Sequence, residues 1–350
     1  MRRTLRRWLL PLAAALTVVS LAGRHLLSSK SRRTSVLASP PTPQTVLLWT
    51  PFFGKTDYIP PLTSQGCPEL PCTFTSNRSA LASSSAVIFH LRDTQPADLP
   101  TSRPSRSQVW VALHHESPHY TPRILTSLNG LINWTATYRR DSDIYLNPRL
   151  AQRQQPVTLP PRRLNKTRLV AWFVSNCDTP SRREAYVNTL RRTVSVDIYG
   201  SCGEKQCLPK MSRECLEKVS QEYYFYLSFE NSICQDYVTE KFYDILQLDI
   251  VPVVLGGADY RALAPPGSYI DARDFEHPRN LGRFLLVLAK DPRRYRRYFA
   301  WKTQFYMTLD PYACQLCRKL VEPTLTPKVY QDLDSWWFTS AQCTTWKLAE

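Results

Sequence analysis

The first 50 residues of this chain of 350 contain no acidic residue, although they contain eight lysines and arginines. Over the whole chain 45 Lys and Arg outnumber 29 Asp and Glu, which gives a formal net charge of +16. Half of the excess therefore lies ahead of the expected globular part. The remaining positive charge suits an acidic ligand such as a nucleotide diphosphate. No RNA- or DNA-binding motif is present, so we expect no nucleic-acid partner.

The chain also lacks a second Cys-x-x-Cys pair to match Cys314-Gln-Leu-Cys317. A zinc site would need two more nearby ligands, and a redox pair would need a thioredoxin-like βαβ context, which is missing. We therefore expect a disulfide between Cys314 and Cys317. Cys67 and Cys72 are expected to close a small loop in the same way. The remaining connectivity is left open, because ten cysteines permit many pairings.

Ten cysteines agree with an oxidising compartment. Three acceptor triplets for N-linked glycans, at Asn77, Asn133 and Asn165, point the same way. The apolar segment Trp8–Gly23 follows four arginines and is shorter than the roughly 20 residues of a usual membrane span. It could be a cleaved signal peptide or an uncleaved signal anchor. The four arginines favour a cytosolic N-terminus, and a short span suits a thin early secretory membrane.

Short apolar runs alternate with helical patterns along most of the chain, and no internal repeat is present. This alternation predicts an α/β fold with parallel sheets. A polar, Pro- and Arg-rich stretch at residues 147–168 separates two such series, which predicts two doubly wound domains. Residues 125–138 are ambiguous between helix and strand. The expected strands are Thr45–Trp49, Ala86–His90 and Val109–Leu113, then Leu169–Val174, Val194–Tyr199, Tyr223–Phe229 and Ile250–Leu255.

Residues 223–242 are the most informative part of the chain. They predict a buried aromatic strand, a polar turn at Glu230–Asp236 and a helix that opens near Thr239. A strand's carboxyl end beside a helix N-terminus favours anionic ligands, because free N–H groups and the helix dipole point there. Lys241 would add a full charge. The alternative is an ordinary turn with a solvated Glu-Lys pair.

Two further groups of polar residues follow expected strands. Glu116 comes just after Val109–Leu113 and could serve as a general base, or be a satisfied turn carboxylate. The neighbouring His114 and His115 are expected to be structural or to contact an acceptor. Ser175 and Asn176 end another strand, and a nearby arginine would complete a diphosphate cradle. Helix capping and a solvated arginine are the alternative reading of this second group.

The motif Phe-Glu-Asn-Ser at 229–232, followed by Tyr-Val-Thr-Glu-Lys-Phe at 237–242, resembles the donor-sugar motif of the α1,3-fucosyltransferases, glycosyltransferase family 10. The resemblance runs from about Val46 to Leu320. Tyr145-Leu146-Asn147-Pro148 departs from it, because many relatives carry Pro-Tyr-Gly there. The cluster Cys202, Cys207, Cys215 and Cys234 is more similar to invertebrate members. Other matching segments are Trp49-x-Pro51-Phe52, Phe89-His90, Glu116-Ser117-Pro118, residues 138–143, Val251–Gly256 and Cys314-x-x-Cys317.

The resemblance implies a B-type glycosyltransferase: two Rossmann-like domains that face each other, behind a single transmembrane helix and stem. Its divisions would be a cytoplasmic tail at 1–7, a signal anchor at 8–23, a stem at 24–44, an acceptor-binding domain at 45–165 and a GDP-fucose-binding domain at 166–342. It also implies a type II protein of the Golgi membrane with a lumenal catalytic part. We therefore prefer the anchor to a cleaved peptide.

The resemblance further assigns roles to individual side chains. Glu116 would be the catalytic base. Arg182 would contact the donor diphosphate, with Arg183 as a nearby competitor. Glu240 would hold fucose hydroxyls or stabilise positive charge at the anomeric carbon, and Lys241 would neutralise the departing diphosphate. The other donor contacts would come from Ser175 and Asn176 at the strand end and from Tyr226, Asn231 and Tyr237, the last three toward guanosine and ribose.

The leading hypothesis is an inverting α1,3-fucosyltransferase that moves L-fucose from GDP-β-L-fucose to O3 of N-acetylglucosamine in glycoprotein or glycolipid glycans. No cofactor is required, and stimulation by Mn²⁺, homodimerisation and the acceptor glycan stay open. One alternative is an inactive glycan-binding relative, which should have lost Glu116, Arg182 or Lys241, yet all three are present. The other is an A-type, metal-dependent transferase that uses Asp141 and Asp143, although Arg139 and Arg140 indicate structural ion pairs there.

Overall fold

The computed structural model describes residues 43–58, 60, 67, 70–159, 166–209, 212–322 and 328–347. The expected tail and anchor lie outside these residues. Within the described ranges, no helix is both long and apolar enough to cross a membrane. Among the described residues, the first strand begins at Gln44, the last residue of the expected stem.

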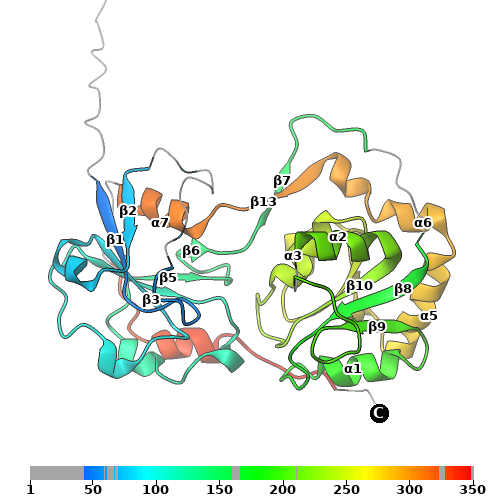
Figure 1. Cartoon of the computed structure of the whole chain (residues 1–350), viewed down its shortest axis with the longest axis horizontal. Coiled ribbons are helices and arrows are strands. Elements are labelled where there is room, and N and C mark those ends of the chain that lie inside the picture. Colours follow the sequence, from blue (N-terminus) through cyan, green and yellow to red (C-terminus); the bar gives the residue numbers. More distant parts are fainter. Residues whose placement is uncertain are drawn as a thin grey trace, which may run out of the picture. The chain divides into compact units, whose positions relative to one another are not determined.

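The first half of the chain forms a six-stranded, all-parallel sheet in the order β2-β1-β3-β4-β5-β6 (Figure 1). Its central strands β3 and β4 are buried at every residue, as expected of a parallel strand covered on both faces. Short 3₁₀ turns replace the long helices of a doubly wound domain. The strands are β1 (Gln44–Leu48), β2 (Cys72–Thr75), β3 (Ala86–His90), β4 (Val109–Leu113), β5 (Trp134–Thr137) and β6 (Ile144–Tyr145).

The ambiguous segment 125–138 contains both kinds of structure. A 3₁₀ turn at Leu125–Leu128 buries two leucines, and β5 follows with every residue buried. Threonines alternate with apolar residues in β5. The sequence therefore shows neither the periodicity of an amphipathic helix nor the continuous apolar run of a buried strand.

The second half forms a five-stranded parallel sheet in the order β12-β11-β10-β8-β9 (Figure 1). Val170, Phe225 and Val253 belong to a core with residues of α1, α5 and α6. Ala171 and Tyr226 belong to another core with residues of α2 and α3. Helices therefore cover both faces, and the predicted parallel α/β fold is confirmed. The bounds are β8 (Arg168–Phe173), α1 (Arg183–Leu190), β9 (Val196–Tyr199), α2 (Arg213–Glu222), β10 (Tyr223–Phe229), α3 (Glu240–Gln247), β11 (Val251–Leu255), α4 (Tyr260–Leu263), β12 (Ile270–Asp271), α5 (Pro278–Ala289) and α6 (Pro292–Arg297).

After α6 the chain returns to the first sheet. Strand β13 (Phe305–Thr308) pairs with β7 (Arg149–Gln152), and α7 (Tyr312–Leu320) then buries Ala313 and Leu316 in a core with residues of β1, β3 and β4. Trp337, in the π-helical turn Ser335–Thr339, joins another core of the first sheet. Residues 312–320 and 330–341 thus pack with the first half of the chain, although the sequence placed them in the second domain.

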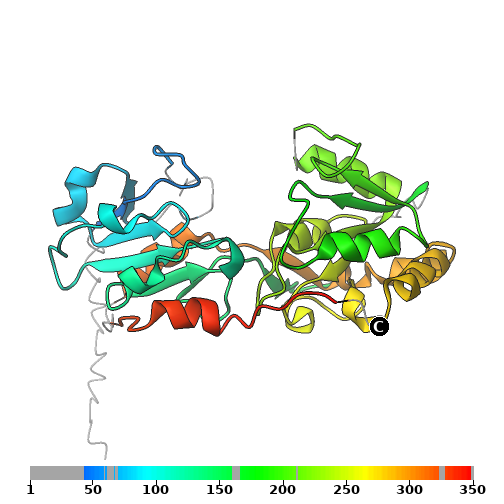
Figure 2. The ribbon, with the colours of Figure 1, turned by 90° about the horizontal axis from the view of Figure 1, so that it is seen from below.

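The last described residues, 341–347, run back to the second half, and we call them the C-terminal strap. Cys343 forms a disulfide with Cys234, and the Thr344 N–H donates to the Ile233 carbonyl at 2.7 Å. The Trp346 N–H donates to the Ser181 carbonyl at 3.2 Å. Figure 2 shows this segment at the red end of the colour scale.

The predicted disulfide pairs Cys314–Cys317 and Cys67–Cys72 are wrong. All four residues are bridged, but as Cys67–Cys314 and Cys72–Cys317. Because Cys314 and Cys317 lie three residues apart in α7, they share one helix face, and both are buried. That face packs toward the first sheet, where Cys72 begins β2. The two bridges therefore fasten α7 to the sheet edge.

Candidate donor pocket and catalytic loop

A hollow of about 240 Å³ lies at the carboxyl ends of β8, β9 and β10, where open parallel sheets bind ligands. We call it the donor pocket. Five residues predicted for donor binding line it: Ser175, Asn176, Asn231, Glu240 and Lys241. The other lining residues are Phe173, Val174, Arg183, Tyr199, Gly200, Gln206 and Cys207.

Lys241 is held in the pocket wall by two carboxylates. Its Nζ lies 3.4 Å from Glu230 Oε2 and 3.3 Å from Glu240 Oε1, and it donates to Thr239 Oγ1 at 2.9 Å. Burial opposes the charge on Lys241, but the fields of Glu230 and Glu240 outweigh it and raise the pKa. The lysine is therefore a fixed cation at the start of α3.

Glu230 is a site residue that the sequence reasoning missed. It is fully buried, and its Oε1 accepts from the Thr239 N–H at 2.9 Å. Burial raises its pKa, against the opposing effect of Lys241. A buried carboxylate needs such partners. The signal in the sequence for its burial was its position directly after a buried strand of seven residues. Glu230 thereby ties the turn to the start of α3.

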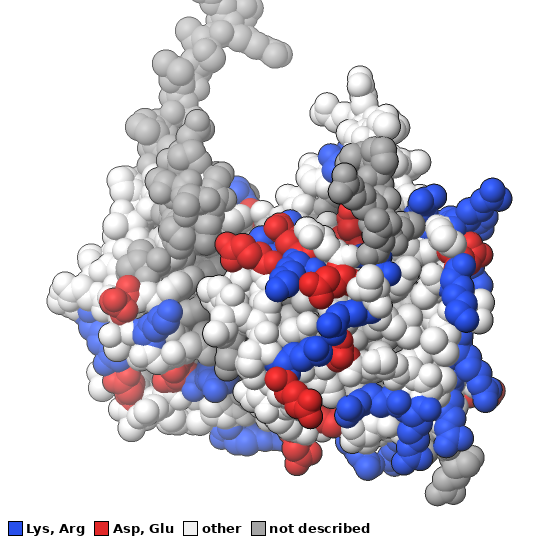
Figure 3. All heavy atoms as spheres, turned by 45° about the vertical axis from the view of Figure 1, so that its right-hand side comes forward, with Lys and Arg blue, Asp and Glu red and all other residues white. Residues whose placement is uncertain are grey.

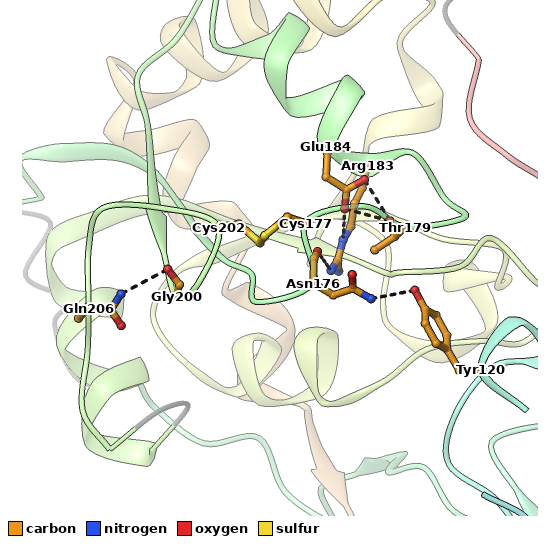
Figure 4. The surroundings of a disulfide bond; sticks show 9 residues. All are labelled: Tyr120, Asn176, Cys177, Thr179, Arg183, Glu184, Gly200, Cys202 and Gln206. Atoms are coloured by element: carbon orange, nitrogen blue, oxygen red, sulfur yellow. Dashed lines mark hydrogen bonds and ion pairs between the residues drawn. A yellow bond between two sulfur atoms is a disulfide. The ribbon is translucent and has the colours of Figure 1, made fainter.

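Of the two arginines considered for the diphosphate, Arg183 lines the pocket and Arg182 does not. Arg182 is exposed, has a φ of +55° and does not line the hollow, whereas Arg183 is 2% exposed and does. Arg183 donates to the Phe229 carbonyl at 2.8 Å. It also donates to the Asn176 carbonyl at 3.2 Å (Figure 4). Arg182 precedes the first residue of α1 in a left-handed conformation, so its side chain is not the one that packs against β10.

Two of the three predicted nucleoside contacts do not line the pocket. Tyr226 and Tyr237 are each 1% exposed, and Tyr237 packs against Tyr138 at a ring separation of 4.9 Å. Asn231 does line it, and its buried Oδ1 has no hydrogen-bond partner among the described residues. A buried acceptor without a partner is costly unless a ligand satisfies it. Asn231 is therefore the best-placed of the three residues to bind a ligand.

A disulfide frames the pocket's opposite wall. Cys177 and Cys202 join the loops after β8 and β9, and Gly200 lies on the Cys202 side of the bridge, next to Gln206 (Figure 4). Gly200 has a φ of +98°, and a Cβ there would lie 2.6 Å from the Val174 carbonyl oxygen. Only glycine fits this close approach. The backbone can therefore pass directly beside the end of β8.

Glu116 follows β4, as predicted, on a half-buried loop. None of the described residues forms a hydrogen bond or an ion pair with its carboxylate. The next residue, Ser117, is fully buried, and its Oγ lies 2.7 Å from Ser232 Oγ, one residue past Asn231. The Asn176 amide also donates to the Tyr120 hydroxyl at 2.9 Å. The Glu116 loop is thus fastened to the loops that form the donor pocket.

Aromatic rings gather beside this loop. Phe52 lies 4.7 Å from His90 and 5.6 Å from His115 between ring centroids. Burial lowers the pKa of His115 to about 4, while the charge of Glu240 acts in the opposite direction. Phe53 is 42% exposed and has a φ of +50°. Asp93 holds this strained turn by accepting from the Phe53 N–H at 2.8 Å.

Asp141 and Asp143, the alternative metal ligands, have protein partners. Arg139 donates to Asp141 at 2.7 and 2.8 Å, and its guanidinium contributes to the lowered pKa of Asp141 against the effect of burial. Asp143 accepts from the Tyr330 hydroxyl at 2.9 Å and lies 3.2 Å from Lys328 Nζ. Asp141 thus has the ion pair that its neighbouring arginines indicated, whereas Asp143 is partnered by Lys328 and Tyr330 instead.

The three glycan acceptors differ in their surroundings. Asn77 is exposed at the start of a 3₁₀ turn, which fits the prediction. Asn133 does not fit it, because the residue is 7% exposed and its amide donates to the Lys328 carbonyl at 2.8 Å. Its Oδ1 also accepts from the Trp110 N–H at 2.9 Å, so the whole side chain is used in packing. Asn165 lies outside the described residues.

A hollow lined by a buried arginine and a half-buried lysine, at the carboxyl ends of parallel strands, is typical of a nucleotide-binding α/β enzyme. Residues 41–148 match the family described as Fucosyltransferase, N-terminal, and residues 163–336 match Glycosyltransferase family 10 (fucosyltransferase) C-term. Alpha-(1,3)-fucosyltransferase C of Drosophila melanogaster is 36% identical over 335 residues, covering 85% of this chain and 79% of that protein. Alpha-(1,3)-fucosyltransferase 7 of Bos taurus is 40% identical over 312 residues, covering 85% and 87%.

A solved structure agrees with the fold. A crystal structure of an α1,3-fucosyltransferase with GDP-fucose matches with a TM-score of 0.53 at 16% identity, over 83% of this chain and 94% of that one. The chain belongs to glycosyltransferase family 10, the fucosyltransferases, and is a glycosyltransferase. The predicted family is confirmed.

Proposed function

We propose that this enzyme transfers L-fucose from GDP-β-L-fucose to O3 of an N-acetylglucosamine residue in a glycan, with inversion at the anomeric carbon. One observation carries the proposal: the pocket with Lys241 and Arg183 is fastened to the Glu116 loop by the Ser117–Ser232 contact. The relatives named as α1,3-fucosyltransferases, and the GDP-fucose complex of the similar fold, support this donor and linkage.

The donor diphosphate would bind between Lys241 and Arg183. Both side chains are already partnered, Lys241 by two carboxylates and Arg183 by two carbonyl oxygens. They are therefore pre-positioned, and little reorganisation is needed when negative charge develops on the leaving group. Asn231 Oδ1 would accept a hydrogen bond from the donor. The stacked rings of Phe173 and Tyr199, 4.6 Å apart, line the same pocket and suit the face of a guanine base.

Glu116 would act as the general base. It would take the proton of the acceptor's O3 hydroxyl as this oxygen forms a bond to the fucose anomeric carbon. The bond from that carbon to the GDP phosphate oxygen breaks at the same time, and its electron pair leaves with GDP. The carboxylate has no partner among the described residues, so it is free to accept a proton. Glu240, the second carboxylate of the pocket, would stabilise positive charge on the sugar ring.

The acceptor would approach over the aromatic cluster beside Glu116. Phe53 is exposed, the strained turn holds its ring 4.6 Å from His90, and the Arg92 guanidinium lies 5.5 Å from it. An exposed ring next to imidazoles is a surface on which a sugar face can stack. Strain held in place by Asp93 is typical of a functional loop. This placement leaves the particular glycan open.

The same family membership supports a Golgi location, with residues 8–23 as a type II signal anchor and a lumenal catalytic part. Five disulfides among the described residues agree with an oxidising compartment. A protease-protection assay on membranes tests the orientation. A lumenal epitope accessible to protease without detergent would contradict it.

The direct test of the function is incubation of the purified enzyme with GDP-fucose and a panel of glycans. The panel should include the innermost N-glycan GlcNAc, antennal LacNAc and LacdiNAc, and a glycolipid. Linkage analysis of the products should find fucose on O3 of GlcNAc. Products linked at any other position, or transfer from another sugar nucleotide in preference to GDP-fucose, would contradict the proposal. Loss of activity on addition of EDTA would instead indicate the alternative, a metal-dependent enzyme that uses Asp141 and Asp143.

A further inference from the structure

A second hollow, of about 580 Å³, lies at the opposite end of the second sheet from the donor pocket. It is bordered by the first residues of β8, the residues between α1 and β9, and the second half of α5. Thr167, Thr193 and Ser195 place polar residues on its wall, and Leu286 and Ala289 add apolar surface. The hollow is therefore amphipathic, as a carbohydrate-binding groove must be.

Nine exposed cations lie on the elements beside this hollow. Residues 278–297, which form α5 and α6, alone carry seven cations and a single acidic residue, Asp291. The segment after α1 packs closely against α5 at Gly282. A Cβ at this position would lie only 2.9 Å from the Thr193 side chain. In Figure 3 the blue side chains gather along the right-hand edge of the molecule, the side on which Figure 1 places α5 and α6. The nine cations are Arg191, Arg192, Arg279, Arg283, Lys290, Arg293, Arg294, Arg296 and Arg297.

None of these nine cations has an ion pair with a described residue, unlike six of the arginines elsewhere on the protein. Arg78, Arg139, Arg168, Arg213, Arg273 and Arg318 all pair with carboxylates. Asp291 is already used, since its side chain accepts from the Arg294 N–H at 3.0 Å and caps α6. Asp197, on the wall of the hollow, is paired with Arg168 at 2.6 Å. The positive charge is thus uncompensated and available to a polyanion.

We propose that this hollow and its nine cations, the basic groove, bind a sulfated glycan chain. Eight of the nine are arginines, whose planar guanidinium forms two parallel hydrogen bonds to a tetrahedral oxyanion. The cations spread over both α5 and α6, and α5 alone extends about 18 Å, so they fit a ligand with repeated anionic groups. The hydroxyls and aliphatic surface of the hollow suit sugar rings. The disulfide-bonded fold places the protein where sulfated glycans occur and nucleic acids do not.

The test measures binding of a heparin oligosaccharide to the full chain by calorimetry over a range of salt concentrations. The triple variant Arg191→Ser, Lys290→Ser, Arg293→Ser removes three cations around the groove. The control variant Arg106→Ser, Lys218→Ser, Lys347→Ser removes three exposed cations elsewhere, with the same change in net charge. We expect the groove variant to bind heparin at least ~10-fold more weakly, with a salt slope lower by roughly two to three. The control should change less than about 2-fold.

GDP binding by both variants, which should be unchanged, confirms that they fold. Equal weakening in the two triple variants would overturn the proposal, because it would reduce the effect to net charge. Absence of heparin binding at physiological salt would overturn it as well. So would equally tight binding of poly-glutamate or of vesicles rich in anionic lipid, which would make the face a docking site for acidic protein or membrane. None of these outcomes depends on whether the enzyme transfers fucose.

Discussion

The hydroxyl oxygens of Ser117 and Ser232 lie 2.7 Å apart, and both side chains are fully buried. Ser117 directly follows Glu116, and Ser232 directly follows Asn231, so one contact joins the proposed base to the donor loop. His119 Nδ1 lies 3.2 Å from the same Ser232 oxygen. The pair therefore links the two loops whose relative position decides whether the acceptor oxygen is in line with the donor.

Ser232→Ala should lower kcat about 5- to 10-fold, because a buried hydrogen bond worth roughly 1 kcal/mol is lost and Ser117 is left with one partner fewer. GDP affinity should change less than 2-fold. Ser220→Ala is the matched control, since Ser220 is also buried but lies in α2 and donates to the Glu217 carbonyl. Steady-state kinetics and GDP titration measure both effects. An equal fall in kcat in both variants would assign the effect to general destabilisation.

Lys241→Ala should weaken GDP binding by about 10- to 100-fold, because a charge-assisted contact is worth roughly 1.5–3 kcal/mol. Arg182→Ala should leave it within 2-fold, since Arg182 is exposed and does not line the donor pocket. Calorimetric titration with GDP measures both. A large loss in Arg182→Ala, or none in Lys241→Ala, would contradict the placement of the diphosphate.

Much of this pocket could be predicted from the sequence, because its residues follow strands directly. Ser175 and Asn176 come just after β8, Asn231 lies in the turn after β10, and Glu240 and Lys241 begin α3. The choice between Arg182 and Arg183 could not be predicted, because it depends on a single left-handed residue before α1. Glu230 was missed because it was assigned to a polar turn, although its position directly after a buried strand was a signal for burial.

Long-range packing explains the other differences. The bridges Cys67–Cys314 and Cys72–Cys317 join residues 247 and 245 positions apart, and only the docking of α7 on the first sheet brings them together. Local spacing therefore suggested the wrong partners. Asn133 shows the same limit, because its triplet is intact while its side chain is buried by a segment almost 200 residues later.

Peptide mapping without reduction tests the bridges. Cleavage after Glu69 separates Cys67 from Cys72, and cleavage after Leu316 separates Cys314 from Cys317. The structure predicts two cross-linked species, one joining the Cys67 and Cys314 peptides and one joining the Cys72 and Cys317 peptides. Species that join Cys67 to Cys72 would show that α7 is not fastened in this way.

Acid should destabilise the fold partly through His115. Burial lowers its pKa from about 6.5 in the unfolded chain to about 4 in the folded protein. Between these values the unfolded state binds more protons, so the free energy of unfolding falls as the pH drops from 6.5 toward 4. His115 should contribute up to about 2 kcal/mol of loss between pH 6.5 and pH 5, reduced by its partial exposure.

His115→Gln cannot take up a proton, so its urea midpoint should fall less than that of the wild type between pH 6.5 and pH 5. Half-buried His277→Gln is the control and should follow the wild type, because its side chain caps the start of α5 away from the core. Parallel curves for wild type and His115→Gln would mean that His115 is not buried in its neutral form.

The central claim is that Glu116 supplies the base at the fastened junction of the two loops. The most direct measurement is single-turnover transfer from GDP-fucose by Glu116→Gln, alongside donor binding by the same protein and the exposed control Glu217→Gln. We predict transfer at least ~100-fold slower, because loss of a general base typically costs about 10²–10⁴ in rate. GDP-fucose affinity should stay within 2-fold. Near-normal transfer by a folded Glu116→Gln protein would contradict the account and direct the search to Glu240.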